Sequence, residues 1–186
     1  MFKLKFSYLF IALALSILFS NCRTEKKAEI ETEIYKSELN LKKDLADFIS
    51  KMSEKDTVRI IVNSTMEYWV RFDELELTKM ENKIWLSTTI KEDTTYELKN
   101  QMRINELADI TIENEGNKFE QHFVKKTERQ KGGDAYQWIY KIISPNDTLK
   151  FYTNGLGDKG GEVKDYLDFM QNYYPNEMEF RPVNVY

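Results

Sequence analysis

Alternating apolar and polar residues mark most of the chain between residues 57 and 102. In Thr57–Asn63 every second residue is apolar, which predicts a strand with one buried side. Similar alternation runs through Glu67–Thr78, Lys83–Lys91 and Thr95–Met102, so we expect three further consecutive strands. Short polar segments separate these runs, which favours an antiparallel meander.

The parity of the apolar positions predicts details of strand pairing. Phe72 and Leu75 have opposite parity, so we expect a bulge near Asp73-Glu74 that returns both side chains to one face. A reversal around Met80-Glu81 and a second one after Lys91 keep apolar residues opposite one another. The expected pairs are Leu77–Ile84, Leu75–Leu86, Ile90–Tyr96 and Ile84–Met102.

Three segments show the three-to-four-residue spacing that is typical of amphipathic helices. Ser37 can cap a helix that runs to about Ser53, and Asn117 can open a second one in which Phe119 and Phe123 share a face. A third helix follows a glycine-rich loop and ends before Pro175. The first and third apolar faces consist of Leu41, Leu45, Phe48, Ile49 and Met52, and of Val163, Tyr166, Leu167, Met170 and Tyr174.

Residues 135–143 and 148–154 form the clearest hairpin. With residues 144–147 as its loop, Ile142 opposes Leu149 and Tyr140 opposes Phe151, while Trp138 lies on the same side. Residues 104–118 stay ambiguous between strand, loop and helix. Together these patterns predict an α+β fold: a single domain with a mainly antiparallel sheet of about six strands and two or three helices packed on one face.

The N-terminus has a different pattern. Lys3 and Lys5 precede the almost unbroken apolar run Phe6–Phe19, and the only cysteine, Cys22, is followed at once by charged residues. The run is shorter than the roughly 20 residues that a spanning helix needs, and the three-part order is typical of a secretory signal. The alternatives are an uncleaved N-terminal anchor and a plain signal peptide with a chance cysteine.

This arrangement resembles a bacterial lipoprotein signal in a relaxed form, with Phe19 and Asn21 at the positions before Cys22. The resemblance implies that residues 1–21 are removed, that Cys22 is lipidated, and that the protein is anchored in the bacterial cell envelope, on the periplasmic or surface side of the outer membrane. Residues 22–36 would then form a polar tether, and residues 37–186 the domain. No family is indicated for the domain itself.

Composition narrows the possible functions. Without residues 1–21, 25 basic and 31 acidic side chains remain, a net charge of −6. A mildly acidic protein lacks the basic patch that nucleic acid requires, so we expect no nucleic-acid partner. Once Cys22 is modified, no thiol is left for a disulfide, a metal site or a nucleophile.

Residues 155–160 read Gly-Leu-Gly-Asp-Lys-Gly, a literal G-x-G-x-x-G between a predicted strand and a predicted helix. A dinucleotide site also needs a parallel strand after the helix, and the preceding strand belongs to an antiparallel hairpin, so we expect no nucleotide cofactor. The segment is interpreted as a flexible connection or as a contact for an anion or a partner at a helix N-terminus. The contact residues would be Gly155, Gly157, Asp158, Lys159 and Gly160.

Other candidate chemistry is sparse. His122 is the only histidine and we expect it on the surface, without a catalytic or metal-binding role. The acidic residues near 73–76 are interpreted as a solvated strand edge, and Trp69 and Trp85 as residues of the second sheet face, buried beneath a helix or exposed to a partner. No metal site is expected.

These observations favour a lipid-anchored envelope protein without catalytic activity, which binds a protein partner or an envelope component. An immunity or accessory lipoprotein would be an example. The alternatives are a passive structural lipoprotein and an envelope hydrolase whose paired carboxylates converge only in three dimensions. The carboxylates of the hydrolase would come from Asp73, Glu74, Glu76, Asp158 and Glu162.

Overall fold

Strand pairing organises the part of the chain that the computed structural model describes, namely residues 35–67, 69–93, 102–112, 118–131 and 137–181. The signal-like segment, the tether up to residue 34 and residues 95–101 of the strand expected over Thr95–Met102 lie outside the described residues. The strands are β1 (Thr57–Asn63), β2 (Val70–Met80), β3 (Lys83–Asp93), β4 (Arg103–Glu106), β5 (Ile110–Ile112), β6 (Trp138–Ile143) and β7 (Thr148–Tyr152).

Within the described residues these strands form one sheet of seven, with the order β4-β3-β2-β1-β6-β7. The remaining strand, β5, also pairs with β3, next to residues 84–86, whereas β4 pairs with residues 89–92. All pairings are antiparallel. The helices are α2 (Leu41–Asp44), α3 (Phe48–Lys51), α4 (Lys118–Val124) and α5 (Leu156–Gln171), with 3-10 turns η2 (Thr127–Gln130) and η3 (Met178–Phe180).

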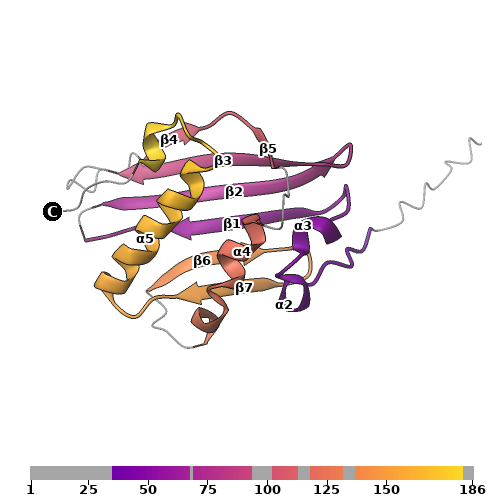
Figure 1. Cartoon of the computed structure of the whole chain (residues 1–186), viewed down its shortest axis with the longest axis horizontal. Helices are drawn as coiled ribbons and strands as arrows, with labels where there is room; N and C mark the ends of the chain where they lie inside the picture. Colours follow the sequence, from indigo (N-terminus) through magenta and orange to yellow (C-terminus); the bar gives the residue numbers. More distant parts are fainter. Residues whose placement is uncertain (1–34, 68, 94–101, 113–117, 132–136, 182–186) are drawn as a thin grey trace, which may run out of the picture. The chain divides into compact units, whose positions relative to one another are not determined.

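The helices cover one face of the sheet, and the core lies between the two layers. Figure 1 shows α5 crossing the sheet diagonally, with α4 beside it on the same face. Val58, Ile60 and Val62 of β1 point into this core and are fully buried, as their alternation predicts. The expected α+β domain with an antiparallel sheet and helices on one face is therefore confirmed.

The β6–β7 hairpin confirms the expected register, because Ile142 opposes Leu149 and Tyr140 opposes Phe151. The position of Trp138 was predicted wrongly. The pairing is irregular between Trp138 and Tyr140, and such an irregularity moves a side chain to the other face. Trp138 consequently lies beside Phe72, with a ring-centroid distance of 6.2 Å.

The expected register of β2 and β3 is wrong by two residues. Leu77 opposes Leu86 rather than Ile84, because the strands join through a two-residue turn at Glu81 and Asn82. Both turn residues have positive φ, 50° and 61°, as a type I′ hairpin requires. A two-residue shift keeps the same side chains on the buried face, so Leu75, Leu77, Ile84 and Leu86 were still assigned to it correctly.

The next expected register is also wrong. Ile84 opposes Ile112 of β5 instead of Met102, and Ile90 opposes Asn105 of β4. Two short strands thus cover the edge of β3 where one long strand was expected.

The single helix expected from Ser37 to Ser53 is divided into α2 and α3. Asp147, in the β6–β7 loop, accepts hydrogen bonds from the backbone N–H groups of Leu41 and Lys42 at 3.2 and 3.1 Å. The N-terminus of α2 is therefore capped from a distant loop rather than by Ser37. The apolar face was identified correctly, since all five of its residues are buried.

The tryptophans of the sheet lie in different surroundings. Trp69 packs against the core, with the Arg71 guanidinium 5.4 Å from its ring centre. Trp85 alternates with the buried Ile84 and Leu86, so it lies on the outer face, partly exposed. The expectation that burial beneath a helix accounts for both tryptophans is therefore wrong for Trp85.

No bulge interrupts β2, because its pairing with β1 and β3 is regular through residues 72–78. The buried face instead continues from Leu75 to the charged residues Asp73 and Arg71, which are 0 % and 2 % exposed. Arg71 donates two hydrogen bonds to the Asp73 carboxylate, from Nε and Nη2, at 2.7 and 2.8 Å. The expected bulge is therefore wrong, because Asp73 and Arg71, although charged, lie on the buried face.

Two further groups complete this buried ion pair. The Tyr166 hydroxyl of α5 donates to Asp73 Oδ2 at 2.8 Å, and Arg71 Nη1 donates to the carbonyl oxygen of Glu179 at 2.9 Å. The Phe180 ring lies 5.5 Å from the guanidinium. The ion pair thereby joins β2, α5 and the C-terminal turn η3.

We expect Asp73→Ala to lower the free energy of unfolding by about 3–5 kcal/mol, because it leaves the Arg71 guanidinium buried without its counter-charge. Urea denaturation at pH 7 measures this change. Glu76→Ala is the matched control on the outer face of the same strand. Its side chain is 44 % exposed and pairs with Arg59, so its loss should cost less than about 1 kcal/mol. Equal losses of stability in the two variants would contradict the conclusion that Asp73 is the buried partner of Arg71.

Candidate functional site

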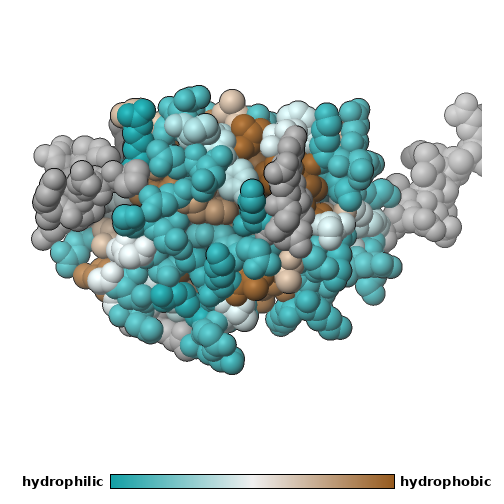
Figure 2. Space-filling model, viewed as in Figure 1, coloured by the Kyte–Doolittle hydropathy of each residue, from teal (hydrophilic) through white to brown (hydrophobic). Residues whose placement is uncertain are grey.

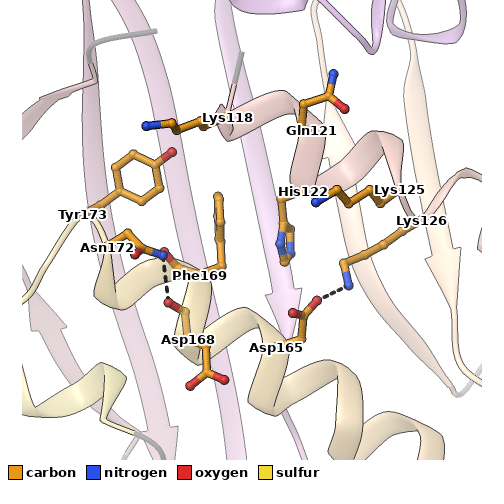
Figure 3. Close-up of a pocket in the computed structure, with 10 residues that line it drawn as sticks. All are labelled: Lys118, Gln121, His122, Lys125, Lys126, Asp165, Asp168, Phe169, Asn172 and Tyr173. Carbon is orange, nitrogen blue, oxygen red and sulfur yellow. Dashed lines mark hydrogen bonds and ion pairs between the residues drawn. The ribbon is translucent and has the colours of Figure 1, made fainter. Parts of the chain in front are cut away.

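A cleft of about 880 Å³ lies between α4 and α5. Figure 3 shows that α4 and the turn after it supply one wall and α5 with the residues after it the other. The lining residues are Lys118, Gln121, His122, Lys125, Lys126, Asp165, Asp168, Phe169, Asn172 and Tyr173. Figure 2, from the same side as Figure 1, shows that hydrophilic residues cover most of this helical face. The cleft is therefore a polar site with an aromatic centre.

His122 lies at the centre of the cleft and is only 9 % exposed, so its expected surface position is wrong. Its ring stacks on Phe169 with centroids 4.0 Å apart and an interplanar angle of 18°. Its Nε2 is hydrogen-bonded to the Tyr140 hydroxyl at 3.1 Å. The local sequence around His122 did not predict its burial, because residues distant in the sequence, Phe169 of α5 and Tyr140 of β6, cover its ring.

The surroundings of His122 keep it neutral. Burial and the nearby Lys126 ammonium lower the pKa of His122 from 6.5 to about 3. Burial also raises the pKa of Tyr140 well above its ordinary value. At neutral pH both groups are therefore uncharged, whereas a general base in catalysis works best with a pKa near the operating pH.

An ion-pair network joins α5 to the segment that follows α4. Lys126 Nζ lies 2.6 Å from Glu162 Oε2 and 2.5 Å from Asp165 Oδ2. Arg129 binds Asp158 at 2.7 Å and Glu162 at 2.9 Å. The side chains of Lys126 and Glu162 are largely buried, so this network fixes one end of the cleft.

The carboxylates suggested for a hydrolase divide into separate groups. Asp73 is buried with Arg71, while Glu74 pairs with Lys91 at 2.8 Å and Glu76 with Arg59 at 3.4 Å. The acidic run is therefore not simply a solvated edge, because its first member lies in the core.

Asp158 and Glu162 do come together, but they do so on the guanidinium of Arg129. That guanidinium lowers the pKa of Asp158, whereas a catalytic acid needs a raised pKa. Among the described residues, no cluster of three or more His, Cys, Asp or Glu side chains is arranged to hold a metal ion.

The glycine-rich segment forms the start of α5 rather than a loop. Gly155 precedes the helix with a φ of 93°, and Gly157 and Gly160 lie inside the helix. The Asp158 carboxylate accepts a hydrogen bond from the N–H of Asn154 at 2.7 Å, next to the helix N-terminus. Lys159 is buried, and burial lowers its pKa. An anion or partner contact at these residues stays a prediction.

Charge is distributed unevenly in the cleft. Asp165 pairs with Lys126, and Asp168 pairs with Lys164 at 2.7 Å. Lys118 and Lys125 are exposed and form no ion pair within the described residues. Two ammonium groups are consequently available on the α4 wall of a protein whose net charge is −4.

Comparisons with protein-family models, curated proteins and solved structures find no match to this chain. Among the described helices, none has the length and apolar character that crossing a bilayer requires. The geometry of the cleft is therefore the main structural basis for a functional proposal.

We expect the stability of the protein to fall between pH 7 and pH 5 because of His122. The unfolded state, with a pKa near 6.5, binds a proton in this range that the folded state, with a pKa of about 3, does not. The free energy of unfolding should therefore drop by about 2 kcal/mol as the pH falls. Urea denaturation at several pH values measures the slope.

His122→Phe is the control for this prediction. It keeps an aromatic ring against Phe169 and removes the only histidine of the chain. We expect its stability to change little between pH 7 and pH 5, where carboxylates are mostly ionised. A wild-type slope in the variant would contradict the account of His122.

Proposed function

We propose that this protein is a lipid-anchored, non-catalytic protein of the bacterial cell envelope, which binds a protein partner or an envelope component through the α4–α5 cleft. The observation that carries the proposal is the pair of exposed ammonium groups, Lys118 and Lys125, which have no ion-pair partner among the described residues and lie beside the partly exposed rings of Phe169 and Tyr173. Aromatic rings that combine apolar surface with a polar tip are frequent anchors of binding sites.

The state of the titratable groups supports binding rather than catalysis. His122 is neutral at physiological pH, and each of the five carboxylates considered for a hydrolase is paired with a cation. The hydrolase alternative therefore gains no support from Asp158 and Glu162, although they lie close together. An immunity or accessory lipoprotein is the kind of protein that this arrangement suits.

The anchor is proposed from the sequence alone, because Cys22 lies outside the described residues. The apolar run Phe6–Phe19 and the following cysteine support cleavage before Cys22 and lipidation of its sulfur. Each buried methylene of an acyl chain contributes about 0.8 kcal/mol to membrane binding, so several chains would hold the protein firmly. The location would be the periplasmic or surface side of the outer membrane.

Cys22→Ala tests the anchor. We expect the variant to incorporate no labelled fatty acid and to leave the membrane fraction, since the thiol that carries the lipid is gone. Radiolabelled palmitate and cell fractionation measure the two effects. Membrane association that persists in the variant would indicate an uncleaved N-terminal helix instead.

Site-specific photocrosslinking in living cells tests the binding role of the cleft. A photoreactive amino acid at Gln121 lies in the cleft lining, while the same residue at Lys141 of β6 lies on the outer face of the sheet. We expect a discrete crosslinked product at position 121 only. Products at 141 but not at 121, or at neither position, would contradict the proposal.

A further inference from the structure

The two exposed lysines on the α4 wall of the cleft are well separated. Lys118 and Lys125 are seven residues apart at the beginning and just beyond the end of α4. Seven residues make about two helical turns, or about 10 Å along the axis. One small anion would not contact both ammonium groups at this spacing, whereas a ligand of roughly disaccharide length with a negative charge near each end would.

Aromatic rings lie beside these charges in the cleft (Figure 3). The rings of Phe169 and Tyr173 are 5.3 Å apart at an angle of 67°, and His122 covers one face of Phe169. Tyr173 is half-buried, and burial raises its pKa to about 12, so its hydroxyl stays neutral and both donates and accepts hydrogen bonds. A flat ligand with an apolar face and a hydroxylated rim would fit such a ring.

Side-chain amides complete the lining. Gln121 lies on the α4 wall, and Asn172 follows α5 on the other. Asn172 Nδ2 donates to the carbonyl oxygens of Asp168 and Phe169, both at 3.0 Å, which holds the amide in place and leaves its oxygen as an acceptor. Amides offer donors and acceptors together, as recognition of neighbouring hydroxyl groups requires.

We propose that the cleft binds a carboxylated saccharide, a chain of sugar rings of the uronic-acid type, with carboxylates at Lys118 and Lys125 and a ring on Tyr173. This inference rests on the proposed binding function and names the class of ligand. Each acidic side chain of the lining is paired with a lysine, Asp165 with Lys126, which Glu162 shares, and Asp168 with Lys164.

Other anionic ligands fit less well. Phosphate is bound most specifically by the planar fork of arginine or by clustered backbone N–H groups, whereas lysine acts only as a point charge, and the described residues that line the cleft include no arginine. An extended acidic peptide binds best by adding a strand to a sheet edge, whereas this cleft lies between two helices. An amphipathic helix would need a continuous apolar groove, whereas charged and amide side chains interrupt the apolar surface of this cleft.

Isothermal titration calorimetry of the full chain in detergent, with tetragalacturonate as the probe, tests the inference. Maltotetraose, a neutral saccharide of equal length, and pentaglutamate, an acidic peptide, are the comparison ligands. We expect tetragalacturonate to bind most tightly, with an affinity that weakens as salt is added. Stronger binding of either comparison ligand would overturn the inference.

Matched variants locate the binding. Lys118→Gln combined with Lys125→Gln should weaken tetragalacturonate binding by about tenfold or more, since two charge contacts are lost. Lys42→Gln combined with Lys150→Gln removes the same charge from exposed positions outside the cleft and should leave the affinity unchanged. Tyr173→Ala should weaken binding more than Tyr173→Phe. Equal effects of the two lysine pairs would overturn the inference.

The photocrosslinking at Gln121 separates the two proposals. No tetragalacturonate binding together with a discrete crosslink at this position would overturn the saccharide class and leave the binding function in place. The absence of both would overturn both proposals.

Discussion

A buried ion pair, Arg71–Asp73, is the constraint on which the arrangement of the helices depends. A charge taken out of water is costly unless a counter-charge and further hydrogen bonds compensate for it. Here the two charges of β2 compensate each other, and two further elements supply hydrogen bonds, because Tyr166 of α5 binds the carboxylate and the Glu179 carbonyl of η3 binds the guanidinium. The need to satisfy these charges specifies where α5 crosses the sheet, which apolar packing alone would leave less defined.

The position of α5 in turn determines the cleft. Its core-facing residues, such as Tyr166 and Met170, contact the sheet, so Phe169 and Tyr173 point sideways toward α4. The stack of His122 on Phe169 closes the contact between the helices, and Lys126 with Arg129 fixes one end. The proposed binding chemistry then rests on Lys118 and Lys125, which have no ion-pair partner in the described part of the chain. The exposed ammonium groups on the α4 wall, beside the aromatic rings of the cleft, support the proposed binding role.

Elements with local signals were predictable from the sequence. Predictions failed where a residue distant in the sequence determines the local structure. The β6–β7 register was predictable because loop length and apolar pairing agree, and the buried faces of β1 and the helices followed from their periodicity. The absence of a bulge in β2 was not predictable, since Asp73 is acceptable in the core only with Arg71 and Tyr166. Likewise, the α2 cap comes from Asp147 and the burial of His122 from α5, neither of which a sequence window contains.

The measurement that tests this account most directly is a double-mutant cycle between the sheet and α5. The free energies of unfolding of the wild type, Asp73→Ala, Tyr166→Phe and the double variant give the coupling between the carboxylate and the hydroxyl. If the buried ion pair holds α5 in place, the coupling should be about 1–3 kcal/mol, as for a buried hydrogen bond to a charged group. Additive effects, with a coupling below about 0.5 kcal/mol, would contradict the account.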